Sequence, residues 1–169
     1  MRHVCETERL TIRQLDLSDA EFILHLLNDE SFLRYIGDKK VRTREDAINH
    51  LTNGPMASYK NHGFGLNLVQ LKGESTAIGM CGLLKREELD YPDLGYAFLP
   101  EFCGKGYARE AAEALLKQAV VKRGMQTVLA VTAPNNLRSM HLLESIGFNL
   151  KGTQELYGLE NNLFEYRSL

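Results

Sequence analysis

Short apolar stretches, some alternating with polar residues and some continuous, recur along the chain and predict β-strands. The first of them is Leu10–Gln14. Two longer apolar stretches, 64–71 and 77–84, are separated by Lys72-Gly-Glu-Ser75, which is typical of a hairpin turn. Four further strands are expected at 93–99, 127–131, 148–157 and 163–168.

Other segments carry apolar residues three and four positions apart, which is the spacing of an amphipathic helix. Ser18 and Glu21 fit a capping box at the start of the first such segment. A second helix is expected to begin near Thr43 and to be interrupted at Gly54-Pro55. A long helix from about 106 to 122 and a short one over 136–145 are each followed by a glycine that ends them. The element order β-α-α-β-β-β-α-β-α-β-β predicts one α/β domain over residues 1–169, with a mixed sheet.

Composition narrows the class of protein. The chain has 169 residues, of which 44% are hydrophobic and 25% charged, as expected for one globular domain with a core. The net charge of −2 gives no electrostatic case for a nucleic-acid partner. No apolar run approaches the ~20 residues of a membrane span, so we expect no membrane partner. Three cysteines without a C-x-x-C pair indicate a reducing, cytoplasmic location.

Two glycines, Gly104 and Gly106, stand between an expected strand and the longest expected helix. Glycines there let backbone N–H groups converge where the helix dipole is positive, which is a phosphate-binding arrangement. The spacing excludes a Walker A loop, because Lys105 lies between the glycines and no Ser or Thr follows Gly106. It also excludes a dinucleotide fingerprint, since Arg109 occupies the third small position and the next strand ends without an acid.

The remaining pattern, x-x-x-G-x-G/A between a strand and a helix, resembles the pyrophosphate loop of the GNAT superfamily of acetyl-CoA-dependent N-acetyltransferases. The usual form there is Q/R-x-x-G-x-G/A, and Glu101 departs from it at the first position. The segment 132–148 resembles the family block N-x-x-S-x-x-x-x-x-x-x-G-F, with Asn136, Ser139, Gly147 and Phe148 on the pattern. The segments 8–13, 28–36 and 43–47 resemble the opening of the RimJ/RimL branch, whose members acetylate N-terminal amines of ribosomal proteins.

This resemblance implies a GNAT fold, which is a mixed, mostly antiparallel, twisted sheet of six to seven strands flanked by helices. Its fourth and fifth strands, here 93–99 and 127–131, are expected to splay apart. The cofactor is then acetyl-CoA, whose pantetheine arm would bond to the strand edge at Phe98 and Leu99. The pyrophosphate would meet the backbone N–H groups of a loop made of Gly104, Lys105, Gly106, Tyr107, Ala108 and Arg109.

Three residues are candidates for more specific roles. Asp93 is the candidate general base that takes the proton of the acceptor amine, or else an ordinary solvated carboxylate at a strand start. Ser139 is expected by family likeness to face the sulfur and to donate to the departing thiolate, or else to bond its own helix backbone. Asn136 either binds the cofactor or caps the short helix. Other branches use a tyrosine on this helix, but none lies between Asn136 and Phe148.

The function implied is transfer of an acetyl group to a primary amine, of a protein N-terminus or a small molecule, directly within a ternary complex. A covalent route through Cys103 is disfavoured, because the sequence places no partner that would activate the thiol. The histidines show no metal-ligand spacing, so we expect no metal. The alternative is a catalytically idle CoA-binding module of the same fold. A monomer and a homodimer both stay open.

Overall fold

A computed structural model describes residues 2–168, which form one domain around an eight-stranded sheet. The strands are β1 (His3–Glu6), β2 (Leu10–Gln14), β3 (Leu66–Leu71), β4 (Ala77–Leu84), β5 (Asp93–Phe98), β6 (Thr127–Thr132), β7 (Asn149–Leu156) and β8 (Leu159–Arg167). Their order across the sheet is β1-β2-β3-β4-β5-β6-β8-β7, and only β5 and β6 run parallel. The expected mixed, mostly antiparallel sheet is confirmed.

The extra strand compared with the expected six to seven is β1. It is a four-residue edge strand that pairs only with β2, and its two outer residues are exposed. So short and exposed a segment carries little hydrophobic pattern, which is why the sequence did not predict it.

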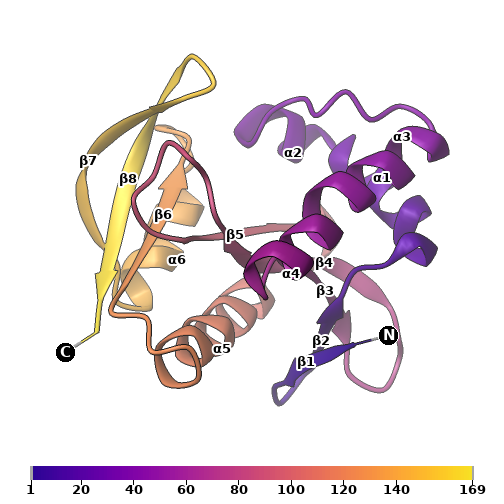
Figure 1. Cartoon of the computed structure of the whole chain (residues 1–169), viewed down its shortest axis with the longest axis horizontal. Coiled ribbons are helices and arrows are strands. Elements are labelled where there is room, and N and C mark those ends of the chain that lie inside the picture. The colour runs from indigo at the N-terminus through magenta and orange to yellow at the C-terminus, as the bar shows by residue number, and fades with distance from the viewer. Residues whose placement is uncertain (1, 169) are drawn as a thin grey trace.

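Six α-helices lie on the two faces of the sheet. They are α1 (Ala20–Leu27), α2 (Glu30–Tyr35), α3 (Arg44–Leu51), α4 (Ala57–His62), α5 (Tyr107–Val121) and α6 (Leu137–Ser145). In Figure 1, β6, β7 and β8 lie beside α6 on one side of the molecule, and β1 to β4 with α1 to α4 lie on the other. None of the helices among residues 2–168 has the length and apolar character needed to span a bilayer.

Two of the predicted helix boundaries were wrong. The capping box before α1 is formed by Asp16 and Asp19 around a 3₁₀ turn, not by Ser18 and Glu21. Gly54-Pro55 does not interrupt the second helical segment, because the π-helical turn Thr52–Met56 joins α3 to α4. A wider π turn tolerates Pro55, which has no N–H to donate. The capping box at Thr43 and Asp46 starts α3 as expected.

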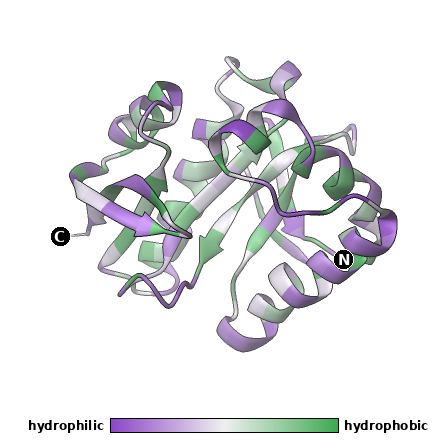
Figure 2. Cartoon of the chain, turned by 90° about the horizontal axis from the view of Figure 1, so that it is seen from above, coloured by the Kyte–Doolittle hydropathy of each residue, from purple (hydrophilic) through white to green (hydrophobic). Residues whose placement is uncertain are grey.

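The sheet separates two apolar clusters. On one face, Ala111, Ala112 and Ala119 of α5 are fully or almost fully buried, and their small side chains let this helix lie close to the sheet. On the other face, α1 and α3 bury Ile23, Leu26, Leu27, Ala47 and Leu51. Figure 2 shows the same arrangement, with hydrophobic residues along the inner strands and hydrophilic ones on the outer sides of the helices.

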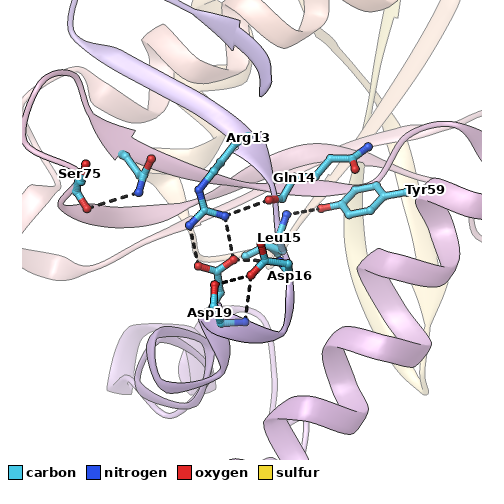
Figure 3. A network of polar contacts seen from close by, with 9 residues as sticks. Arg13, Gln14, Leu15, Asp16, Asp19, Tyr59 and Ser75 are labelled. Carbon is cyan, nitrogen blue, oxygen red and sulfur yellow. Dashed lines mark hydrogen bonds and ion pairs between the residues drawn. The ribbon is translucent and has the colours of Figure 1, made fainter. Parts of the chain in front are cut away.

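A polar network ties the α1–α4 layer to the sheet (Figure 3). Arg13 of β2 donates to both carboxylate oxygens of Asp19, at 2.9 and 2.7 Å. The N–H of Leu15 donates to the hydroxyl of Tyr59 on α4 at 2.9 Å, and that hydroxyl donates in turn to the C=O of Leu66. These bonds join the helical layer to β2 and β3 on the face of the sheet opposite α5.

The sheet opens between β5 and β6. β4 and β5 pair from Gly79–Phe98 to Leu84–Asp93, whereas β5 and β6 share the single register position Asp93–Leu129. The N–H of Leu129 donates to the C=O of Pro92 at 3.0 Å, and beyond this point the two strands diverge. The predicted splay is therefore present, and it leaves one edge of β5 open.

Candidate active site

The open edge of β5 presents backbone groups that have no strand partner among residues 2–168. Residues of an antiparallel strand alternate between bonding across the pair and pointing to the opposite edge. The N–H of Leu99 donates to the C=O of Ile78 at 2.9 Å, so in this register Tyr96 and Phe98 point toward β6. Because β6 has already diverged, the backbone N–H groups of Tyr96 and Phe98 are available to an extended, amide-containing ligand.

Leu99 differs from the expectation drawn from the sequence. Its N–H is bonded to Ile78, and its C=O accepts the N–H of Phe102 at 3.0 Å. Both backbone groups are thus used within the chain. The thiol of Cys103 also turns toward this C=O, at 3.6 Å, and makes no hydrogen bond to a histidine or carboxylate within residues 2–168.

The glycine loop follows β5 and leads into α5. Gly104 and Gly106 have φ angles of +79° and +84°, a region that residues with a side chain rarely adopt. Gly106 is the N-cap of the 15-residue helix α5, and in the described part of the chain no side chain caps the first N–H groups of that helix. The N–H groups of Tyr107, Ala108 and Arg109 therefore stand free at the positive end of the helix dipole. This arrangement fits a diphosphate.

Charged side chains surround this loop. Lys105 and Arg109 are exposed, and neither makes an ion pair within residues 2–168. Glu101, which departs from the family pattern, is also exposed and lies in the 3₁₀ turn Pro100–Phe102. A second carboxylate, Glu110 in the first turn of α5, is paired with Arg9, so Lys105 and Arg109 leave an excess of positive charge that favours an anion.

Arg9, the residue directly before β2, contacts the loop from outside, and the sequence did not predict this contact. Its guanidinium donates to the C=O of Lys105 at 3.0 Å and to Glu110 at 2.7 Å, and it lies 4.5 Å from the centroid of the Tyr107 ring. Burial opposes ionisation of Glu110, but hydrogen bonds from Thr7 and Arg9 outweigh it and hold the pKa of Glu110 below its ordinary value. No local pattern signals this contact, because Arg9 and Glu110 are 101 residues apart.

Asp93 lies where β5 and β6 begin to separate, and its side chain is buried rather than solvated. One carboxylate oxygen accepts from Nε of Arg86 at 3.2 Å, and the other has no hydrogen-bond partner within residues 2–168. Burial raises the pKa of Asp93 to about 6, although the Arg86 guanidinium acts in the opposite direction. A buried carboxylate with a free oxygen and a pKa near neutrality is a functional-site candidate.

Asn136 and Ser139 lie in the first turn of α6. The side-chain oxygen of Asn136 accepts the N–H of Ser139 at 3.3 Å, so Asn136 is the helix cap. The hydroxyl of Ser139 lies 2.6 Å from the hydroxyl of Tyr96, which comes from β5. Tyr96 was not among the residues expected from the sequence, because 43 positions separate it from Ser139. A tyrosine from β5 thus contacts the first turn of α6, whose own sequence from 136 to 148 contains none.

The candidate groups lie on both faces of the open edge. Strand alternation puts Tyr96 on the α5 side, where it packs with Leu94 and Phe98, and Asp93 on the opposite side with Ala97. Asp93 and Tyr96 are about 10 Å apart along the strand. A ligand lying in the gap would have its phosphates at the glycine loop, its amides along β5 and its far end near Asp93.

The fold and this site define a class of acyltransferase, and the comparison with known families agrees. The model of the acetyltransferase (GNAT) domain matches residues 9–149, so the chain belongs to the GNAT acetyltransferase family. It is an N-acetyltransferase, and its acetyl donor is acetyl-CoA.

Individual relatives extend over nearly the whole chain. The "Uncharacterized N-acetyltransferase YnaD" of Bacillus subtilis is 28% identical over 148 residues, which cover 86% of this chain and 82% of that protein. An acetyltransferase from Agrobacterium tumefaciens superposes with a TM-score of 0.85 at 23% identity, covering 99% of this chain and 95% of its own. RimL, a ribosomal L7/L12 alpha-N-protein acetyltransferase solved with coenzyme A, has a TM-score of 0.83 at 16% identity, with 98% of each chain covered. The two structures share the fold with this chain.

Proposed function

We propose that this enzyme moves the acetyl group of acetyl-CoA directly to a primary amine while donor and acceptor are bound together. The observation that carries the proposal is the buried Asp93 carboxylate at the closed end of the open edge, with one oxygen free. Acetyl-CoA supplies a thioester, whose carbonyl is open to attack by a neutral amine. We assign donor binding, the base and the hydrogen bond to the leaving thiolate to groups of the chain.

Donor binding is assigned first to the glycine loop. Backbone N–H groups from Gly104 to Arg109 bind the diphosphate, and Lys105 and Arg109 add charge-assisted bonds. Both side chains are exposed, and neither forms an ion pair within residues 2–168, which supports this assignment. Asn136 keeps its amide nitrogen for the cofactor, since its oxygen caps α6.

The open edge of β5 is assigned to the pantetheine arm. The backbone groups of Tyr96 and Phe98 pair with its two amides as a neighbouring strand would. A backbone N–H on the same edge donates to the carbonyl oxygen as negative charge develops there, an effect worth about 3–4 kcal/mol where such a donor has been removed in another enzyme. Leu99 is not part of this proposal, because both of its backbone groups are already bonded.

Asp93 removes the proton of the acceptor amine, directly or through a water molecule. An ordinary aspartate is a weak base, with a pKa near 3.9. Burial makes Asp93 a stronger one, and its pKa of about 6 leaves it mostly ionised at neutral pH. Arg86 holds one oxygen of the carboxylate and leaves the other for the proton. Ser139 keeps its proton and donates a hydrogen bond to the thiolate as it departs.

Among the possible acceptor amines, we propose the N-terminus of a peptide as the first candidate. The neighbours of the same fold include RimL and a ribosomal-protein-S5-alanine acetyltransferase from Vibrio fischeri, and the opening of this chain resembles that branch. A spermidine N-acetyltransferase chimera also shares the fold, with a TM-score of 0.75, which keeps small-molecule amines as the second class. We also propose that the enzyme acts in the cytoplasm.

The test is to incubate the protein with acetyl-CoA and a mixed panel of peptides, polyamines, amino sugars and amino acids. We expect free thiol to be released only in the presence of an acceptor, and one panel member to gain the mass of an acetyl group. If CoA binds tightly while thiol release never exceeds the acceptor-free rate, the chain is an idle CoA-binding module instead.

A further inference from the structure

The contact between Tyr96 and Ser139 spans the open edge of the sheet. Tyr96 comes from β5, on one side of the gap, and Ser139 from α6, which packs beside β6 on the other. Their hydroxyl oxygens are 2.6 Å apart, and the Tyr96 hydroxyl also lies 3.3 Å from the backbone oxygen of Ser139. Within residues 2–168 these are the only hydrogen bonds that the two hydroxyl groups make.

Tyr96 changes what the Ser139 hydroxyl does. A serine inside a helix ordinarily turns its hydroxyl back to a carbonyl of the preceding turn, where it cannot serve a ligand. The first turn of α6 is fixed by the bond from the N–H of Ser139 to Asn136, so only rotation about one side-chain bond remains. The contact with Tyr96 selects the rotamer in which the hydroxyl faces β5 rather than its own helix.

The hydrogens of the pair can be arranged in two ways. Ser139 can donate to Tyr96, which then donates to the Ser139 backbone oxygen. Alternatively, Tyr96 donates to the Ser139 hydroxyl oxygen, and the Ser139 hydrogen is free to point into the gap. A developing thiolate favours the second arrangement, because a hydrogen bond to a charged acceptor is roughly twice as strong as a neutral one.

Burial excludes Tyr96 as the proton source itself. Burial raises the pKa of Tyr96 above its ordinary value of about 10, whereas that of a cysteine-like thiol is about 8.5. The phenol therefore keeps its proton when it faces a thiolate. No proton is transferred in this step, and the Tyr96–Ser139 pair contributes only a hydrogen bond to the thiolate.

We propose that Tyr96 is a positioning residue that aims the Ser139 hydroxyl at the departing thiolate of CoA. This inference rests on the proposed function, in which Ser139 is the thiolate donor. In this proposal a residue of β5 orients the Ser139 hydroxyl, which the residues of α6 alone would not do.

The first experiment needs no acceptor. CoA is bound to the protein, and the ionisation of its thiol is followed across pH by the ultraviolet absorbance of the thiolate. The complex with S-methyl-CoA, which has no free thiol, gives the background absorbance to be subtracted. A hydroxyl aimed at sulfur lowers the pKa of the bound thiol below that of free CoA. Tyr96→Phe, which removes only the phenolic oxygen, is expected to raise that pKa by about one unit, the equivalent of one hydrogen bond.

The variants separate this inference from the function on which it rests. Ser139→Ala is expected to raise the thiol pKa as much as Tyr96→Phe does, and the double variant no further than either single one. If Ser139→Ala shifts the thiol pKa but Tyr96→Phe does not, the positioning role is overturned while Ser139 remains the donor. If neither shifts it, Ser139 is not the thiolate donor, and the assignment of Ser139 in the proposed function is overturned as well.

A kinetic cycle adds a second readout once an acceptor is known. Tyr96→Phe is expected to lower kcat about tenfold, with the KM for acetyl-CoA nearly unchanged, and to have no effect in the Ser139→Ala background. Tyr166→Phe is the matched control, because Tyr166 is half-buried against Phe148 and its hydroxyl makes no hydrogen bond within residues 2–168. An equal loss of kcat in both backgrounds would show that Tyr96 acts through the general structure.

Discussion

The two edges of β5 differ although they belong to the same six residues. Toward β4 the strand is paired along its whole length, and toward β6 it is paired at Asp93 alone. On the paired edge the backbone groups are used in hydrogen bonds to β4. The open edge leaves backbone groups without a partner, and buried groups in that state are costly unless a ligand completes them. The difference shows that two strands which diverge leave hydrogen-bonding groups exposed along one edge, and we propose that the cofactor binds to these groups.

Asp93 lies where the paired and open edges meet, and its replacement is expected to have the largest effect. Asp93→Asn preserves shape but removes the base, so kcat should fall by about 10²–10⁴-fold. In the wild-type enzyme kcat/KM should rise through a pH of about 6 as Asp93 loses its proton. Steady-state rates across pH check both points, and a variant that kept this limb of the profile would show that another group is the base.

Replacement of Gly106 tests the proposal that the glycine loop binds the diphosphate of CoA. Gly106→Val places a side chain at a φ of +84°, with its Cβ 3.2 Å from the Arg9 guanidinium, so the loop must move. Backbone strain of about 1–3 kcal/mol, together with the displaced N–H groups, should weaken CoA binding by about 100-fold. Isothermal titration calorimetry with CoA measures this loss.

A matched control is available at Gly73, in the β3–β4 turn, where φ is +83° and a Cβ would meet nothing within 4 Å. Gly73→Val imposes similar strain far from the loop. It should lower the melting temperature and leave CoA affinity unchanged. An equal loss of affinity in both variants would contradict the assignment of the loop.

The burial of Asp93 should also appear in the stability of the protein. Because its pKa is higher in the folded than in the unfolded state, its contribution is fully present below pH 4 and is lost as the pH rises through about 6. The free energy of unfolding should fall over this window by about 2–3 kcal/mol relative to Asp93→Asn. Urea unfolding of both proteins across the window measures the difference, and parallel curves would refute it.

Replacement of Arg9 is expected to have the smallest effect, and it tests whether cofactor binding at the open edge depends on the contacts of Arg9 with the glycine loop. Arg9→Ala removes the bonds to Lys105 and Glu110, so the glycine loop should become less ordered and the KM for acetyl-CoA should rise about fivefold to tenfold. Arg9→Lys should restore only part of the loss, since lysine cannot form the same two bonds while stacking on Tyr107. A change in kcat with KM constant would argue against a role in donor binding.

Much of the fold could be predicted from the sequence because its signals are local. Short apolar stretches, alternating or continuous, placed seven of the strands, the glycines marked the loop before α5, and Thr43 with Asp46 marked the start of α3. The short exposed β1, the helix α2 and the π turn at Pro55 carried too weak or too ambiguous a pattern. Asp16 rather than Ser18 caps the first turn, and because Asp16 with Asp19 has the same spacing as Ser18 with Glu21, the local pattern alone did not choose between them.

The sequence by itself determined which residues are chemically able to act: the glycine loop, a carboxylate at a strand start and a serine near a helix start. Only the tertiary structure decided that Asp93 is buried with a free oxygen, that Leu99 is already bonded, that Arg9 supports the loop and that Tyr96 meets Ser139. The physical reason is range. Caps, turns and alternation act within a few residues, whereas burial and contacts over 43 or 101 positions depend on how the sheet orders its strands.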